Sequence, residues 1–149
     1  MAEAVRLRGH HLLCMLTYIG KGYTRDFTDN FDAVIGRINR GAAIEIVAGA
    51  DVICGALRKN NIMVCDHARV CRAARTVQRD RRALRDVGRV LRKPGLAVGD
   101  RLRLGRREIR LLRHMFAQNT IRSGCSRCQW RGFCSQIAAN GFEGARLSP

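Results

Sequence analysis

Hydrophobic and polar residues alternate over two short stretches in the first third of the chain. Residues 5–8 (Val-Arg-Leu-Arg) and 43–47 (Ala-Ile-Glu-Ile-Val) both show the two-residue period of a β-strand. Between them lie two segments with helical patterns, residues 10–20 and a helix that Thr28 would cap and Gly41 would end. A strand, two helices and a second strand predict a unit whose two strands are parallel neighbours.

Longer helical patterns occupy the second half of the chain. Apolar residues recur at helical spacing from about residue 68 to 92 and again from about 106 to 122, and a Pro-Gly pair separates the two stretches. Residues 49–67 carry several Gly and Asn and predict an irregular segment. We therefore predict one α+β domain over residues 1–149, mostly helical, with a short two-stranded parallel sheet.

The charge of the chain is unevenly distributed. The formal net charge is +16, and residues 1–57 are neutral on balance, so the whole excess lies in residues 58–149. A basic half is typical of proteins that bind nucleic acid or acidic proteins. Nearly all of the basic residues are arginine, a skew that a GC-rich genome also produces. Asp80 falls near the apolar stripe of its helix, where it could pair with an arginine.

The most informative feature is a C-x2-C-x5-C run near the end of the sequence. Cys125, Cys128 and Cys134 lie within ten residues, and three thiolates at that spacing can close around one metal centre. Gly132 stands where the chain could reverse to bring the third sulphur to the other two. The sequence shows no secretory leader and no membrane span, so we expect a cytoplasmic protein whose clustered cysteines bind metal rather than form disulfides.

The identity of the metal is open between iron and zinc, because C-x2-C occurs in both kinds of site. The x5 arm around an aromatic residue resembles the iron–sulphur staple of certain bacterial helicase–nucleases, in which a distant upstream cysteine completes the set. We therefore expect an iron–sulphur cluster, with 4Fe-4S favoured and zinc as the alternative. The associated nuclease site needs an Asp/Glu-x-Lys signature, and none of the three lysines here is part of one.

For the fourth ligand, Cys54 and Cys14 are the leading candidates. If the two strands are parallel neighbours, the segments that follow them converge and bring these two cysteines together. Cys65 lies in the same irregular region as Cys54. His10 and His11 stand at the end of the first strand, where they could bind a metal or donate to a cluster sulphur, or serve as ordinary core residues.

A wider resemblance spans nearly the whole chain. The motif RGHHLLC at 8–14, the Gly22-Tyr23 pair, DVIC at 51–54 and the closing C-x2-C-x-W-x3-C occur in this order in an uncharacterised bacterial and archaeal family of similar length. Its members are described as candidate iron–sulphur proteins. The resemblance implies that three upstream cysteines join the terminal three as candidate ligands: Cys14, Cys54 and Cys65. It implies no activity.

Three functions are compatible with these patterns. The leading hypothesis is an iron–sulphur protein in redox chemistry or sensing, whose cluster ties the C-terminal segment to the N-terminal half and whose basic helices dock an acidic redox protein. The first alternative is a nucleic-acid-associated module with a structural cluster or zinc. The second is a metalloenzyme with an open site beside His10 and His11. No membrane partner is expected, and the common nucleotide and hydrolase signatures are absent.

Overall fold

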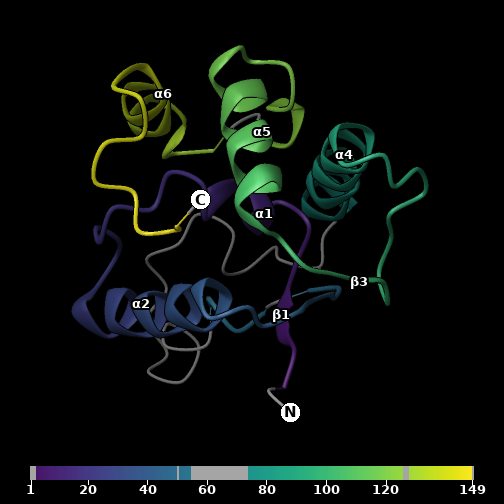
Figure 1. The fold of residues 1–149 in the computed structure, drawn as a ribbon, viewed down its shortest axis with the longest axis horizontal. Coiled ribbons are helices and arrows are strands. Elements are labelled where there is room, and N and C mark those ends of the chain that lie inside the picture. Colours follow the sequence, from purple (N-terminus) through teal and green to yellow (C-terminus); the bar gives the residue numbers. More distant parts are fainter. Residues whose placement is uncertain (1–2, 50, 55–73, 126–127, 149) are drawn as a thin grey trace.

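The structure, a computed structural model, describes residues 3–49, 51–54, 74–125 and 128–148 (Figure 1). The α+β fold class and its mostly helical character are confirmed. In chain order the elements are β1 (Val5–Leu7), α1 (His11–Cys14), α2 (Arg25–Asn39), β2 (Ile44–Ile46), α4 (Ala74–Val90), β3 (Arg101–Leu102), α5 (Arg106–Ala117), the 3-10 turn η1 (Ser123–Cys125) and α6 (Arg131–Ala139).

The sheet is small and mixed. β1 and β2 pair in parallel, with Val5 opposite Ile44 and Leu7 opposite Ile46, which confirms the predicted parallel pair. A third strand, β3, pairs antiparallel with β2, so the sheet has the order β1-β2-β3 instead of the two strands predicted. β3 has two residues, and a stretch of that length is too short to show an alternating pattern.

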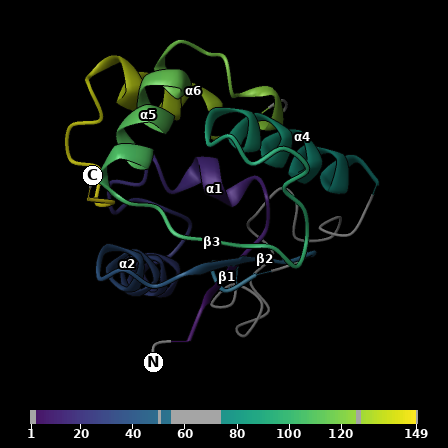
Figure 2. The ribbon, with the colours of Figure 1, turned by 45° about the vertical axis from the view of Figure 1, so that its right-hand side comes forward.

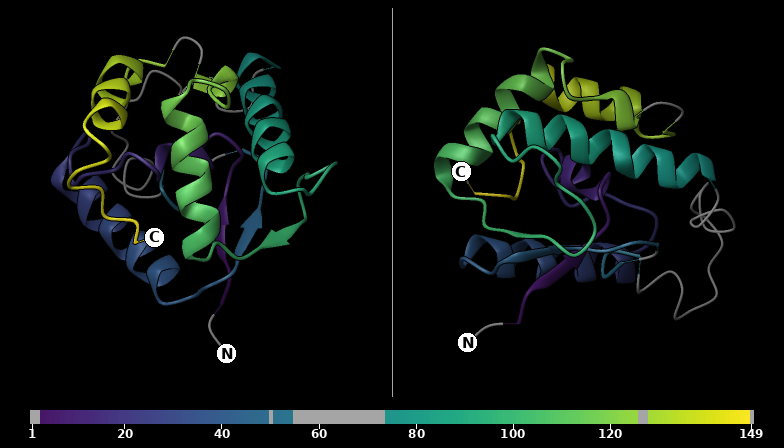
Figure 3. Two further views of the ribbon diagram at one scale, coloured as in Figure 1. Left: turned by 45° about the horizontal axis from the view of Figure 1, so that its top comes forward. Right: turned by 90° about the vertical axis from the view of Figure 1, so that its right-hand side faces the viewer.

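The helices lie on two sides of α1. Figures 2 and 3 show α4, α5 and α6 on one side of it and α2 with the sheet on the other. Leu12 and Leu13 of α1 are almost completely buried between these two layers. The side chains around α1 therefore come from segments that are far apart in the sequence.

The first two helices differ from their predicted bounds. α1 is much shorter than predicted and ends at Cys14. Beyond it, Tyr18 donates its hydroxyl hydrogen to Asp32 of α2 at 2.8 Å. α2 begins one turn earlier than predicted. Its N-cap is Thr24, whose hydroxyl oxygen accepts the N–H of Phe27 at 3.0 Å, and Thr28 lies inside the helix.

The two basic helices form where the periodicity predicted them. α4 lies within the predicted range of 68 to 92, and residues 68–73 fall outside the described residues. α5 ends at Ala117, earlier than predicted, because Asn119 takes a left-handed backbone conformation with φ of 64°. Within the described ranges, no helix combines the length and the apolar character needed to cross a membrane.

The cysteine segment contains a helix that the sequence pattern did not predict. Gly132, expected to reverse the chain, lies inside α6. The reversal comes earlier, where the N–H of Cys128 donates to the carbonyl of Cys125 at 3.1 Å and the N–H of Arg131 to that of Cys128 at 3.1 Å. Ile137 is the one residue of α6 that is buried, so the helix has only a weak apolar periodicity in the sequence.

Candidate metal centre

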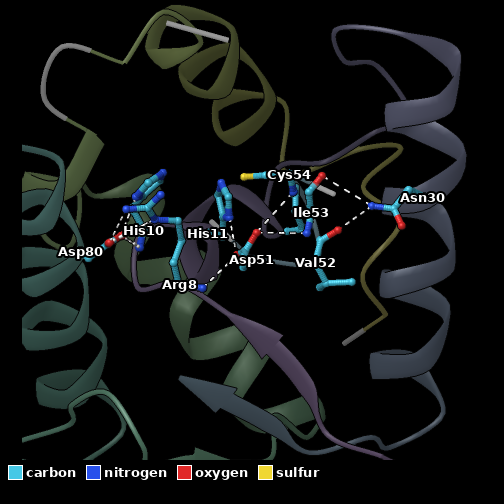
Figure 4. Close-up of polar contacts among 9 residues, drawn as sticks. All are labelled: Arg8, His10, His11, Asn30, Asp51, Val52, Ile53, Cys54 and Asp80. Atoms are coloured by element: carbon cyan, nitrogen blue, oxygen red, sulfur yellow. Dashed lines mark hydrogen bonds and ion pairs between the residues drawn. The ribbon is translucent and has the colours of Figure 1, made fainter. Parts of the chain in front are cut away.

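The segment that joins β1 to α1 is built around two aspartates from distant parts of the chain (Figure 4). The Arg8 guanidinium donates to Asp80 of α4, with Nη2 and Oδ2 2.8 Å apart, and the Arg8 backbone N–H donates to Asp51 Oδ2 at 2.8 Å. His10 Nδ1 lies 2.6 Å from Asp80 Oδ1, and His11 Nδ1 lies 2.6 Å from Asp51 Oδ2. Each aspartate therefore orients one histidine, and Arg8 contacts both aspartates.

Close packing against α4 explains the residues of this segment. A Cβ at Gly9 would collide with the backbone carbonyl oxygen of Asp80, so the strand end can approach α4 only with glycine at this position. The Arg8 side chain is 2% exposed, and a buried guanidinium requires a counter-charge. Asp80 supplies it. The arginine that pairs with Asp80 comes from the end of β1 and not from the basic helix itself.

The protonation states of the two buried pairs follow from their surroundings. Burial alone would raise the pKa of Asp80, but the hydrogen bonds from His10 and Arg8 outweigh burial and hold this pKa well below its usual range. Burial, together with the charge of His11, lowers the pKa of His10 to about 3. Burial likewise opposes ionisation of Asp51, but the charge and hydrogen bond of His11 prevail and lower the pKa of that carboxyl. His10 is thus a neutral ring that donates Nδ1–H to an ionised carboxylate.

The buried neutral His10 makes stability depend on pH. Because its pKa falls from an ordinary value of about 6.5 to about 3, the unfolded chain binds more protons between these values, and stability decreases as the pH falls. One proton corresponds to at most about 1.4 kcal/mol per pH unit. Asparagine keeps a donor near the Nδ1 position and does not titrate. His10→Asn should therefore flatten the unfolding free energy between about pH 6 and pH 4.5, measured by urea unfolding.

The matched control for this measurement is the exposed His114 of α5. His114→Asn should keep the wild-type slope, because it changes an exposed side chain and leaves the buried His10–Asp80 pair intact. A His10→Asn curve as steep as the wild-type curve would contradict the assignment of a neutral buried ring.

The turn that follows β2 is held from two sides. Asp51 Oδ1 accepts the backbone N–H of Ile53 at 3.0 Å and that of Cys54 at 3.4 Å. The Asn30 side chain of α2 donates to the carbonyl oxygens of Val52 at 2.7 Å and Ile53 at 3.5 Å (Figure 4). These bonds fix the position of the Cys54 side chain relative to α1.

The predicted convergence of the segments after β1 and β2 is present. His11, Asp51 and Cys54 each offer one potential ligand atom, and these atoms all lie within 4.8 Å of one another. The sequence singled out Cys54 and His11 but assigned no role to Asp51. The available signal was a lone carboxylate in the segment that follows β2.

Cys14 lies with the three C-terminal cysteines. Burial raises the pKa of the Cys14 thiol, and the negative charges that Cys128, Cys125 and Cys134 would carry raise it further, so the four sulphurs are close enough to interact. All four side chains are partly buried. Of the two leading candidates for the fourth position, the structure places Cys14 beside the terminal three.

The other upstream candidates are placed differently. Cys54 lies with His11 and Asp51, as described above. Cys65 falls outside the described residues.

Neighbouring elements hold the four cysteines in position. Thr17, one turn after Cys14, donates its hydroxyl hydrogen to Cys134 Sγ at 3.1 Å. In η1, the carbonyl oxygen of Gly124 accepts from Arg79 Nε of α4 at 2.9 Å. A Cβ at Gly124 would come within 2.9 Å of the Arg79 carbonyl oxygen, so glycine permits the tight contact between η1 and α4.

Two buried arginines flank the cysteines. Arg79 and Arg122 are 4% and 6% exposed. The Arg122 guanidinium donates to Ser135 Oγ at 2.7 Å and to the carbonyl oxygen of Arg131 at 3.1 Å. Burial raises the pKa of Cys125, while the Arg122 hydrogen bond and both positive charges act in the opposite direction. The sequence did not single out these two arginines, because many others surround them.

Aromatic rings accompany the cysteine segment. Trp130 makes edge-to-face contacts with Tyr23, at 5.5 Å between ring centroids, and with Phe133, at 5.6 Å. Gln129 donates to the Tyr23 hydroxyl at 2.8 Å. The segment between Cys128 and Cys134 is therefore attached to the chain that follows α1.

Comparison with known protein families matches residues 22–134, about three quarters of the chain, to a family described as "Protein of unknown function (DUF1284)". The matched segment includes Cys54 and the three C-terminal cysteines and begins after Cys14. No curated protein and no solved structure matches the chain. The description of the family names no activity and no cofactor. The chain belongs to the DUF1284 family of proteins of unknown function.

Proposed function

We propose that the protein binds an iron–sulphur cluster through four cysteines and uses it for one-electron transfer or redox sensing. The observation that carries this proposal is the gathering of four thiols from α1, η1, the following turn and α6. The proposed ligands are Cys14, Cys125, Cys128 and Cys134. Four thiolates form a complete protein ligand set for a 4Fe-4S cluster.

Zinc is the alternative metal. Zinc binds thiolates at about 2.3 Å, which places the sulphurs of a tetrahedral site about 3.8 Å apart. The ligands of a multinuclear cluster stand further apart than those of one ion.

The charges around the cysteines also support the proposal. A cluster with four thiolate ligands carries net negative charge, and burying that charge requires compensation. Arg79 and Arg122 are the buried cations next to the sulphurs. The Nε of Arg122 is buried and has no hydrogen-bond partner within the described residues, so this group has a donor available for an acceptor at the centre.

Arg122 should therefore influence the reduction potential. The reduced cluster carries one more negative charge than the oxidised cluster, so loss of a nearby cation destabilises the reduced form more. Arg122→Gln should lower the midpoint potential, whereas Arg122→Lys, which keeps the charge, should change it less. Spectroelectrochemical titration measures both values. Equal potentials in the wild type and Arg122→Gln would show that this charge does not act on the cluster.

The redox role is tested by reduction and reoxidation. Anaerobically purified protein would be titrated with dithionite and then reoxidised, with visible absorption and electron paramagnetic resonance recorded at each step. Reversible bleaching with a paramagnetic signal of one unpaired electron per cluster is expected. If the cluster is present but is destroyed whenever it is reduced, the redox role is overturned and the cluster is structural.

The exposed face of α4 supports an acidic protein as the redox partner. Three arginines of this face line a hollow of about 770 Å³ together with the chain that follows the helix, which adds Arg92: Arg81, Arg85 and Arg89. Leu84 and Leu96 supply apolar lining, which suits a protein surface better than a phosphate backbone. Nucleic acid is the alternative partner, and steeply salt-dependent binding of DNA or RNA would favour it. Reduced cysteines fit a cytoplasmic location.

A further inference from the structure

His11, Asp51 and Cys54 form a second group of reactive side chains, with different members from the proposed cluster ligands. Their potential ligand atoms lie within 4.8 Å of one another, and Figure 4 shows the Cys54 sulphur turned toward the His11 ring. We propose that Cys54 is a nucleophilic thiol that exchanges with disulfide substrates, that His11 is its base, and that Asp51 orients His11. The arrangement is that of a nucleophile, a base and an orienting carboxylate.

The hydrogen bonds of Asp51 argue against a metal ion at this place. Asp51 Oδ2 accepts from the Arg8 backbone N–H and from His11 Nδ1, and Oδ1 accepts from the backbone N–H groups of Ile53 and Cys54. A carboxylate has about four acceptor sites, so these bonds use the whole capacity of Asp51.

The distances lead to the same conclusion. His11 Nδ1 and Asp51 Oδ2 are 2.6 Å apart, whereas two ligands bound at about 2.0 Å in a tetrahedral zinc site lie about 3.3 Å apart. Asp51 therefore positions the ring, and the remaining ligand atoms of this group, counted over the described residues, are His11 Nε2 and Cys54 Sγ. Catalytic zinc sites use three protein ligands. The geometry favours a thiol and its base.

The exposure of the three side chains suits this assignment. The Asp51 side chain is 0% exposed, that of His11 is 12% exposed, and Cys54 is partly exposed. The base is thus held in a shielded position while the thiol remains reachable. Arg8 lies close enough to Cys54 for the two charges to interact, and this cation favours the thiolate.

The backbone up to Cys54, the last described residue before position 74, favours one class of substrate. Acyl transfer needs N–H donors directed at the developing oxyanion. The N–H groups of Ile53 and Cys54 already donate to Asp51, so they cannot serve an acyl substrate. In thiol–disulfide exchange the developing charge stays on sulphur and needs no such donors.

The proposed exchange balances without a further reactant. His11 Nε2 accepts the proton of the Cys54 thiol, and the thiolate attacks one sulphur of the disulfide. The new bond joins Cys54 Sγ to that sulphur, and the original disulfide bond breaks. The leaving thiolate takes up the proton from His11, so the products are a mixed disulfide at Cys54 and one free thiol.

The experiment measures the rate of mixed-disulfide formation at Cys54 in the full-length protein. The probe is 4,4′-dithiodipyridine, a neutral disulfide that the positive charge of the protein does not attract. The reaction is run at about pH 6, where an ordinary thiol with a pKa of about 8.5 is about 0.3% ionised. Trypsin releases residues 41–58 as a peptide whose one cysteine is Cys54, so mass spectrometry follows this thiol separately from all others.

We expect Cys54 of the wild type to react about tenfold faster than N-acetylcysteine, after allowing for the lower nucleophilicity of a less basic thiolate. His11→Asn keeps a donor toward Asp51 but removes the base, and should lower the rate at Cys54 by a similar factor. The matched control, His114→Asn, should leave this rate unchanged.

Two results would overturn the proposal. One is a Cys54 rate in the wild type no higher than that of N-acetylcysteine, a comparison that needs no variant. The other is an equal rate in folded His11→Asn protein. The cluster proposal is tested separately by the iron content of the same samples, since the two sites share no cysteine.

Discussion

Replacing Cys14 by serine is expected to remove most of the iron from the protein, while replacing Cys54 by serine is expected to leave the iron content at the wild-type level. Cys14 lies close enough to the three C-terminal cysteines for their charges to interact, whereas Cys54 lies with His11 and Asp51. A cluster that loses one of four thiolates becomes labile and open to water. Iron and acid-labile sulphide per chain, measured after anaerobic purification, give the comparison.

Cys65→Ser completes this set of variants, because the family resemblance also made Cys65 a candidate ligand. All three variants exchange a thiol for a hydroxyl at one position, so they differ only in which sulphur is removed. Loss of iron in Cys54→Ser or Cys65→Ser, with iron retained in Cys14→Ser, would show that the fourth ligand has been assigned to the wrong cysteine.

Replacing Asp80 by asparagine is expected to lower the free energy of unfolding by about 3–5 kcal/mol, because it leaves a buried guanidinium without its counter-charge. Arg8 is 2% exposed and donates to Asp80 through both Nε and Nη2. The change also weakens the acceptor for the Nδ1 and backbone N–H of His10. Chemical unfolding followed by circular dichroism, on samples of equal metal content, measures the loss.

Asp29→Asn serves as the control for this change. Asp29 lies on the exposed side of α2 and pairs with Arg25 at 3.9 Å, and an exposed pair of this kind contributes little to stability. Its unfolding curve should match the wild-type curve. A stability of Asp80→Asn equal to that of the Asp29→Asn control would contradict the role given to the Arg8–Asp80 pair.

The parallel strand pair was the part of the fold that the sequence predicted best. Residues 5–8 and 43–47 alternate clearly, and helical segments between them leave parallel pairing as the simplest arrangement. The meeting of the segments after β1 and β2 follows from that pairing. This is why Cys54 and His11 could be placed together before the structure was known.

The choice between Cys14 and Cys54 could not be made from the sequence. Both cysteines follow parallel strands, so both were expected at the same end of the sheet. The decision depends on which side of α1 each sulphur faces, and this is set by contacts such as Thr17 with Cys134 and Arg79 with Gly124. These contacts join residues more than 40 positions apart and leave no periodic pattern.

Short or weakly amphipathic elements were missed for a related reason. β3 has two residues, and α6 has one buried residue, Ile137. Neither element therefore shows a repeat of apolar residues in the sequence. The role of Asp51 was missed because a carboxylate in a turn is ordinary in sequence. Two of its four hydrogen bonds, from the Arg8 N–H and from His11 Nδ1, form only when the fold brings these residues to it.

The most direct test of the proposed centre is the content of iron, acid-labile sulphide and zinc in anaerobically purified wild-type protein. We predict iron and sulphide in nearly equal amounts, with the broad visible absorption of thiolate-bound iron and little zinc. Stoichiometric zinc in a colourless protein without sulphide would contradict the iron–sulphur assignment and the electron-transfer role.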